Sequence, residues 1–262
     1  MRAIMNAWTR TVVALGCVSV AAALLGGCGG LRETMRLPCK CEAIPYSLIY
    51  AKNAPVIDGN LDDEVWQQAV RLDTFYEYEK SGVRIKDVAT AWMAWDKDNL
   101  YLAATVKDKD LYVYQKENDV DLCRADAVEL FLKPRADRMD LYEFQFNMWN
   151  AVCDYHYLSR GGSSERFRAW NSGAVAHSVI HGTPNDWTDV DEGWQIEIAI
   201  PMKAFVDVAP DGPKPGDTWK FNITGYDWSV YRDKYLLFTS FDNNTKGFIE
   251  HEGYPSMQFM AP

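Results

Sequence analysis

The chain has few basic residues and few histidines. Its 262 residues include 27 Lys and Arg against 37 Asp and Glu, for a formal net charge of −10, and only four His. Proteins that track nucleic-acid phosphates carry a basic patch, so this charge argues against nucleic acid as a partner. The His residues lack the H-E-x-x-H spacing of a helical zinc site, and no G-x-S-x-G nucleophile motif occurs.

Long amphipathic helices and internal repeats are also missing. Beyond residue 45 the sequence alternates in short apolar runs such as "VATAWMAW" (88–95) and "LYLAATV" (100–106), with turn-rich segments between them. At least nine such runs predict an all-β, antiparallel, jelly-roll-like β-sandwich. "LDDEVWQQAV" (61–70) predicts one or two short helical turns that bury Trp66. Aromatic residues are 13% of the chain, which fits a thick β core or an exposed stacking site.

The N-terminal residues have the pattern of a secretory leader. Two Arg and an apolar run come before Leu-Gly-Gly-Cys, which is typical of a secretory signal over residues 1–27. Its end resembles the lipobox of bacterial lipoproteins. That resemblance implies a lipidated Cys28, a tether over 28–45, a folded domain over 46–262 and a secreted, membrane-anchored protein. Gly29 favours the outer membrane in a Gram-negative cell. An ordinary signal peptide and an uncleaved anchor are the alternatives.

Strand alternation predicts a polar face on three strands. Side chains two residues apart in a strand share a face, so Glu129 points away from the apolar residues of "AVELFLK". Hairpin pairing would put it beside Gln145 or Asn147. Sugars are bound by flat rings together with a few polar groups, and an ordinary solvated sheet face is the alternative. The candidate carbohydrate-binding residues found in this way are Glu129, Gln145, Asn147, Trp149, Thr224, Tyr226 and Trp228.

Five motifs occur in the order and spacing of a known family. "PVIDGNLDDEVW", "AWDKDNLYLAATVKD", "DAVELFL", "GWQIEIAIP" and "GDTWKFNI" together resemble family 9 carbohydrate-binding modules, over residues 55–259. The resemblance implies a β-sandwich that binds poly- or oligosaccharide without catalysis and usually holds structural calcium. Such modules are often joined to plant-polysaccharide hydrolases, so glycoside hydrolases are implied partners.

The resemblance also implies a site. The family clamps a terminal sugar between two Trp rings, with Glu, Arg, Gln and Asn as hydrogen-bonding groups. The motif positions put Glu129 at the Glu, Gln145 at the Arg and Thr224 at the Gln. The Asn falls near Thr245, and the two clamp positions fall at Cys123 and near Phe248. Because only the carboxylate and one aromatic ring are retained, the family's specificity does not carry over.

Two cysteines and four acids extend the candidate list. Cys123 and Cys153 both lie 15 residues from Arg138, so a hairpin centred there predicts either a disulfide or two free thiols. Short runs of acids supply the hard oxygen ligands that calcium prefers, and solvated turn acids are the alternative. The candidate metal ligands are Asp96, Asp98, Asp108 and Asp110.

The leading functional prediction is a lipid-anchored surface module that retains carbohydrate near the cell. A glycoside hydrolase would need an acid and a base, and the candidate pairs are Glu129 with Asp126 and Glu129 with Glu143. Against the first pair, Asp126 and Glu129 should point to opposite faces of one strand. A haem-binding electron-transfer sandwich would need a Met ligand. Met148 and Met257 show no evident His partner. A structural or adhesion protein is a further alternative.

Overall fold

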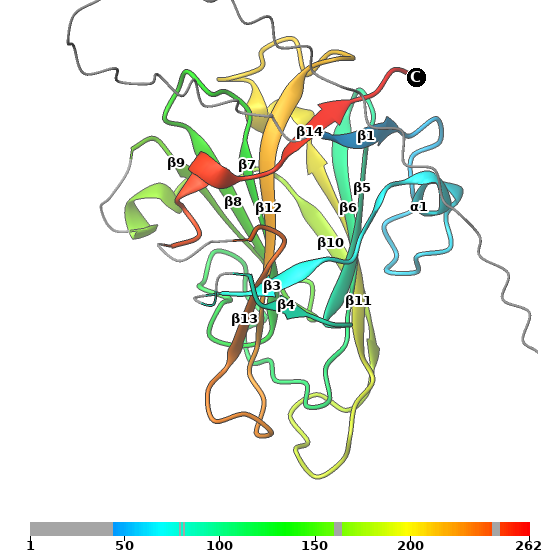
Figure 1. The fold of residues 1–262 in the computed structure, drawn as a ribbon, viewed down its shortest axis with the longest axis vertical. Helices are drawn as coiled ribbons and strands as arrows, with labels where there is room; N and C mark the ends of the chain where they lie inside the picture. Colours follow the sequence, from blue (N-terminus) through cyan, green and yellow to red (C-terminus); the bar gives the residue numbers. More distant parts are fainter. Residues whose placement is uncertain (1–43, 79, 81, 160–163, 243–246) are drawn as a thin grey trace, which may run out of the picture. The chain divides into compact units, whose positions relative to one another are not determined.

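The computed structural model describes residues 44–78, 80, 82–159, 164–242 and 247–262 (Figure 1). The predicted leader, Cys28 and nearly all of the predicted tether lie outside these residues. The described ranges belong to one compact unit, which begins at residue 42. Within them no helix is both long and apolar enough to cross a membrane.

The first sheet carries the candidate site. Its strands are β3 (Phe75–Glu77), β4 (Arg84–Ile85), β7 (Ala127–Lys133), β8 (Leu141–Phe146), β9 (Val152–Tyr157), β12 (Thr218–Asp227), β13 (Leu236–Thr239) and β14 (Ser256–Phe259). Their order is β9-β8-β7-β12-β13-β3-β4, and β14 pairs with the start of β12. The long strand β12 therefore lies at the centre of this sheet, beside β7 (Figure 1).

The second sheet closes the sandwich. It contains β1 (Tyr46–Tyr50), β2 (Arg71–Leu72), β5 (Ala89–Trp95), β6 (Asn99–Val106), β10 (Val175–His181) and β11 (Gly193–Pro201). The order is β10-β11-β6-β5-β1, with β2 also paired to β5. The prediction of an all-β sandwich is confirmed. Strand β1 departs from the antiparallel pattern, because its first half pairs parallel with β14 and its second half parallel with β5, which links the two sheets.

The apolar side chains of the alternating strands fill the space between the sheets. Trp95, Trp194 and Trp219 are buried in this core together with large rings such as Phe144 and Phe221. A sheet face covered by such residues removes a large apolar area from water, which is the main force that holds the two layers together. The opposite side of the first sheet, called here its outer face, carries the polar residues of the candidate site.

In the part of the chain that the structure describes, helices are few and short, as the sequence predicts. They are α1 (Glu64–Gln68) and the 3-10 helices η1 (Ser164–Phe167), η2 (Met202–Phe205) and η3 (His251–Gly253). Helix α1 places Trp66 against the outer face of the second sheet, and its indole Nε1 donates to Glu197 Oε1 at 2.6 Å. Glu197 also accepts from the backbone N–H of Asp58 and of Gly59, whose φ of 86° suits a glycine turn. Trp66 is therefore a packing residue.

Candidate functional site

The register of three strands brings the central polar residues together. On the outer face of the first sheet, Glu129 of β7 lies opposite Gln145 of β8 and opposite Thr224 of β12. Between the two predicted neighbours of Glu129, the structure selects Gln145. The hairpin of β7 and β8 and the long strand β12 thus form the floor of the candidate site.

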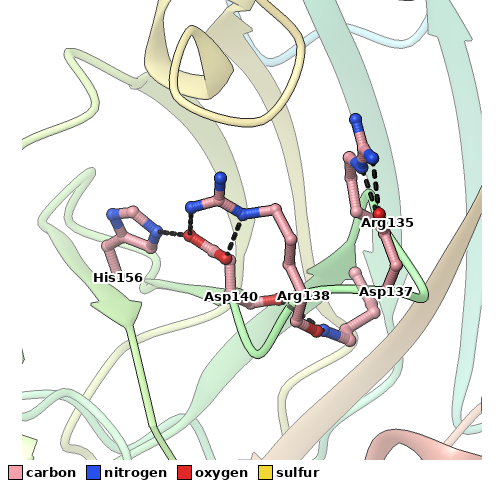
Figure 2. Close-up of polar contacts among 6 residues, drawn as sticks. Arg135, Asp137, Arg138, Asp140 and His156 are labelled. Atoms are coloured by element: carbon pink, nitrogen blue, oxygen red, sulfur yellow. Dashed lines mark hydrogen bonds and ion pairs between the residues drawn. The ribbon is translucent and has the colours of Figure 1, made fainter.

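The turn between β7 and β8 is held by ion pairs (Figure 2). The Arg138 guanidinium donates to both carboxylate oxygens of Asp140, at 2.7 and 3.2 Å, and Asp140 also bonds His156 Nε2 at 2.9 Å. Arg135 forms a second two-point contact with Asp137, at 2.8 and 2.6 Å. Two-point Arg–carboxylate contacts are directional, so they help to shape this turn, and the bond from Asp140 to His156 joins it to β9.

Two buried carboxyl groups lie side by side on this floor. Thr224 Oγ1 donates to Glu129 Oε2 at 2.7 Å, while Gln145 Nε2 and Tyr157 Oη each donate to Glu143 at 2.7 Å. These hydrogen-bond donors are all neutral. Burial, and then the neighbouring Glu143, raise the pKa of Glu129 well above its usual value, and burial raises the pKa of Glu143. The raised pKa of Glu129 favours its protonated state, in which a carboxyl group can both donate and accept.

Aromatic rings close the outer side of the floor. The Phe248 ring centroid lies 5.9 Å from that of Phe131 and 6.1 Å from that of Tyr226. Phe131 and Tyr226 flank the paired residues Glu129 and Thr224 on their strands, so the Phe248 ring lies on the same outer face as this pair. Glu129 is only 1% exposed. Glu129 therefore lies on the predicted face of its strand, but that face is covered at this point by other side chains.

Tyr157 is a member of the site that the sequence reasoning missed. It lies on β9, where the alternation of "VCDYHY" puts Cys153, Tyr155 and Tyr157 on one face, and that pattern could have identified it. Its neighbour Tyr155 donates to Asp121 Oδ1 at 2.6 Å, and Arg168 binds the same oxygen at 2.6 Å. Strand β9 thus extends the polar and aromatic floor beyond the three predicted strands.

The two cysteines are free thiols at the margin of this floor. Cys153 lies opposite Gln145 in the β8–β9 register and is buried, and Cys123 is half-buried. The disulfide alternative is not realised in the structure. Burial raises the pKa of each thiol to about 12, and nearby Glu129 contributes to the shift of Cys123. Cys123, at one predicted clamp position, therefore lies near Glu129 as a thiol.

Asn147 and Trp149 do not belong to the site. Strand β8 ends at Phe146, so the alternation that placed them with Glu143 no longer applies. Asn147 Oδ1 accepts the backbone N–H groups of Trp149 and Ala151, at 3.0 and 3.1 Å, and closes the turn. Trp149 packs against the core between the sheets. Both predictions are corrected to structural roles.

Trp228 is directed to another surface. Strand β12 ends at Asp227, and the Trp228 indole Nε1 donates to the Cys123 carbonyl at 3.0 Å. Its ring lies 4.3 Å from that of Tyr235. Thr245 lies outside the described residues. Of the nine predicted carbohydrate-binding residues, the structure brings together Glu129, Gln145, Thr224, Tyr226 and Phe248.

The candidate calcium ligands do not fit one ion. Asp96 uses both carboxylate oxygens in its turn, accepting from the backbone of Asp98 and Asn99 and from Tyr101 Oη at 2.7–2.8 Å. Asp108 and Asp110 follow the far end of β6, so the two pairs are separated by the length of that strand. Among the described residues, no group of three or more His, Cys, Asp or Glu side chains could hold a metal. Calcium remains a prediction without a ligand set.

The enzyme and haem alternatives gain no support from this geometry. Asp126 accepts the backbone N–H groups of Tyr112 and Trp228, at 2.6 and 2.7 Å, and so is directed away from Glu129. Met148 and Met257 are buried in the apolar core between the sheets. Their side chains serve packing in this fold.

Fold and site together define a β-sandwich module with polar groups and aromatic rings gathered on the outer face of one sheet. The chain belongs to the family described as "Carbohydrate family 9 binding domain-like", whose model matches residues 57–250. This confirms the resemblance seen in the sequence motifs.

Known proteins similar to this chain include one enzyme and solved binding modules. Endo-1,4-beta-xylanase A of Thermotoga neapolitana is 27% identical over 174 residues, which are 64% of this chain and 14% of that enzyme. A carbohydrate binding module of family 9 from Caldicellulosiruptor kristjanssonii, solved with cellotriose, matches with a TM-score of 0.54 and 18% identity over 83% of this chain and 94% of the module. Its complex with glucose gives a TM-score of 0.52 and 18% identity, over 82% of this chain and 95% of that one. At this identity the likeness shows the fold.

Proposed function

We propose that this domain binds carbohydrate without acting on it, at the outer face of the first sheet around Glu129. The observation that carries the proposal is the convergence of Glu129, Gln145 and Thr224 under the rings of Tyr226 and Phe248. Family membership supports it, as does the binding of cellotriose and glucose by the similar Caldicellulosiruptor kristjanssonii module.

The chemistry of the floor suits sugar hydroxyls. A neutral carboxyl group donates one hydrogen bond and accepts others, which matches a hydroxyl group that also does both. The rings of Tyr226 and Phe248 offer apolar faces to the C–H groups of a pyranose. Because Glu129 is buried, a sugar can reach it only after the side chains that cover it move aside.

A binding role is favoured over hydrolysis by the placement of the two carboxyl groups. A glycosidase sets its acid and its second carboxylate on opposite sides of the scissile bond, with room for the sugar between them. Here Glu129 and Glu143 lie on neighbouring strands of one floor, and each is engaged by neutral donors. The two side chains therefore do not face each other across a space for the sugar.

We further propose that lipid attached to Cys28 holds the domain at the cell surface, on the outer membrane in a Gram-negative cell. The leader-like residues 1–27 and the Leu-Gly-Gly-Cys motif support this. The similarity to a xylanase suggests glycoside hydrolases as functional partners, whose polysaccharide substrate or products the domain would retain. Metabolic labelling with palmitate tests the anchor: the wild type should be labelled and Cys28→Ala should not. Label in both, or in neither, contradicts the proposal.

Sugar binding is tested with the full-length chain in detergent, by glycan array and by calorimetric titration with cello-oligosaccharides. Glu129→Gln should lower the affinity at least about tenfold, since a hydrogen bond to a sugar hydroxyl is lost or misdirected. Glu197→Gln is the matched control, because it changes another buried strand carboxylate on the other sheet, and should leave the affinity within about twofold. Equal affinities of the wild type and Glu129→Gln would refute the site. Release of reducing sugar would refute the non-catalytic role.

A further inference from the structure

A hollow lies at one end of the sandwich, beyond the end of β12. It is formed by the loops that join β6 to β7, β10 to β11 and β12 to β13, at the lower end of the view in Figure 1. The hollow measures about 380 Å³ and is open to solvent. Its principal lining residues are Tyr112, Trp187, Trp228, Val230, Asp110 and Asn185.

Large apolar side chains are left exposed around this hollow. Trp187 is 67% exposed, Val230 63% and Tyr112 41%. Single exposed apolar residues are ordinary on a protein surface, but aromatic rings gathered from three separate loops indicate a binding surface. Trp228, which the sequence placed at the first site, contributes its ring here.

Buried carboxylates hold these loops in place before any ligand arrives. Asp126 is 1% exposed, and it ties the Tyr112 and Trp228 backbones together through hydrogen bonds of 2.6 and 2.7 Å. Asp110 Oδ2 accepts the Val230 N–H at 2.6 Å and so bridges the β6–β7 and β12–β13 loops.

The third loop is joined in the same way. Asp191 Oδ2 accepts the Leu111 N–H at 2.8 Å, and Asn185 Oδ1 accepts the Val113 N–H at 3.0 Å. A surface whose loops are already ordered loses little conformational entropy on binding. Asp110 and Asp191 therefore have a structural role in these loops that requires no bound metal.

We infer that this hollow is a second carbohydrate site, which takes a pyranose ring of a neutral polysaccharide. Rings such as Trp187 and Tyr112 supply flat apolar faces for the sugar's C–H groups. The ionisable groups that line it are the tyrosine and Asp110, and the whole chain carries a net charge of −10, so an anionic polymer is disfavoured. The exposed Asn185 amide can bond a hydroxyl group. This site is separate from the Glu129 floor.

The test measures binding of the full-length chain to insoluble cellulose and xylan and to soluble oligosaccharides. Trp187→Ala and Tyr112→Ala should each lower the affinity for the polymer about tenfold or more, as loss of a central aromatic contact does. Met139→Ala is the control, since Met139 is also apolar and 46% exposed but lies in the turn between β7 and β8. Its affinity should equal that of the wild type. All three variants should unfold at the wild-type denaturant midpoint.

The two sites fail in distinguishable ways. If Trp187→Ala retains wild-type affinity for polymer while Glu129→Gln loses it, this inference is overturned and the first site stands. The reverse pattern supports the inference and removes the first site. If the wild type binds no glycan, both are overturned. If Trp187→Ala instead abolishes a self-association seen by sedimentation, and no glycan affinity changes, the hollow is a protein interface.

Discussion

Glu197 provides the sharpest stability prediction, because one buried carboxylate connects the helix α1 to the second sheet. It is fully buried and accepts three hydrogen bonds, from Trp66 Nε1 at 2.6 Å, Gly59 N at 2.9 Å and Asp58 N at 3.1 Å. Replacing it with Ala leaves three donors without their acceptor.

The magnitude follows from the number of orphaned donors. Hydrogen bonds to a charged acceptor contribute about 1.5–3 kcal/mol each, and an unsatisfied buried donor costs about 1–3 kcal/mol. Two of the bonds, those of Trp66 and Gly59, are buried, so Glu197→Ala should lower the free energy of unfolding by about 3–5 kcal/mol. Glu197→Gln keeps one acceptor oxygen and the side-chain shape, and should cost about 1–3 kcal/mol.

The assay is urea unfolding followed by Trp fluorescence and circular dichroism. A double-mutant cycle of Glu197→Ala with Trp66→Phe should give a coupling energy above about 1 kcal/mol, since Trp66→Phe removes an indole N–H that the first change has already orphaned. Additivity within about 0.5 kcal/mol would refute the reasoning, because it would mean that the 2.6 Å contact contributes nothing to stability.

Three further predictions concern the first site and its surroundings. The pKa of Glu129 is raised in the folded state, so its contribution to stability is full below pH 4.5 and is lost as the pH rises towards the raised value. The free energy of unfolding should therefore fall less steeply between pH 4.5 and 7 in Glu129→Gln than in the wild type. Parallel curves for the two proteins would contradict the raised pKa of Glu129. Asn147→Ala should lower the free energy of unfolding by about 1–3 kcal/mol and leave glycan affinity unchanged, because the side-chain oxygen of Asn147 closes a turn. Loss of glycan binding by a folded variant would place Asn147 in the site. Cys123 and Cys153, with pKa values near 12, should resist iodoacetamide at pH 8 until the chain is unfolded, as read by peptide mass spectrometry. Alkylation of either thiol in the native protein would contradict its raised pKa.

Alternation along each strand was sufficient to predict much of the site's floor. The side-chain period of two fixed Glu129, Gln145 and Thr224 on one face without any tertiary information, because a slip of one residue would expose the apolar core. The same rule failed for Asn147 and Trp228, which lie beyond the ends of β8 and β12. Strand ends depend on where neighbouring strands stop pairing, and that is not a local property.

The amino-acid sequence by itself determined the two-layer β architecture, the family and the face on which Glu129 lies, since each follows from local periodicity and ordered motifs. Tertiary structure decided whether that face is open. Phe248, far from Glu129 in the chain, packs against Phe131 and Tyr226 on the same face. Buried acidic side chains join the three distant loops that bring Trp187, Tyr112 and Trp228 to one end of the sandwich. Exposure is set by what packs on a surface from elsewhere in the chain, and no strand pattern records that.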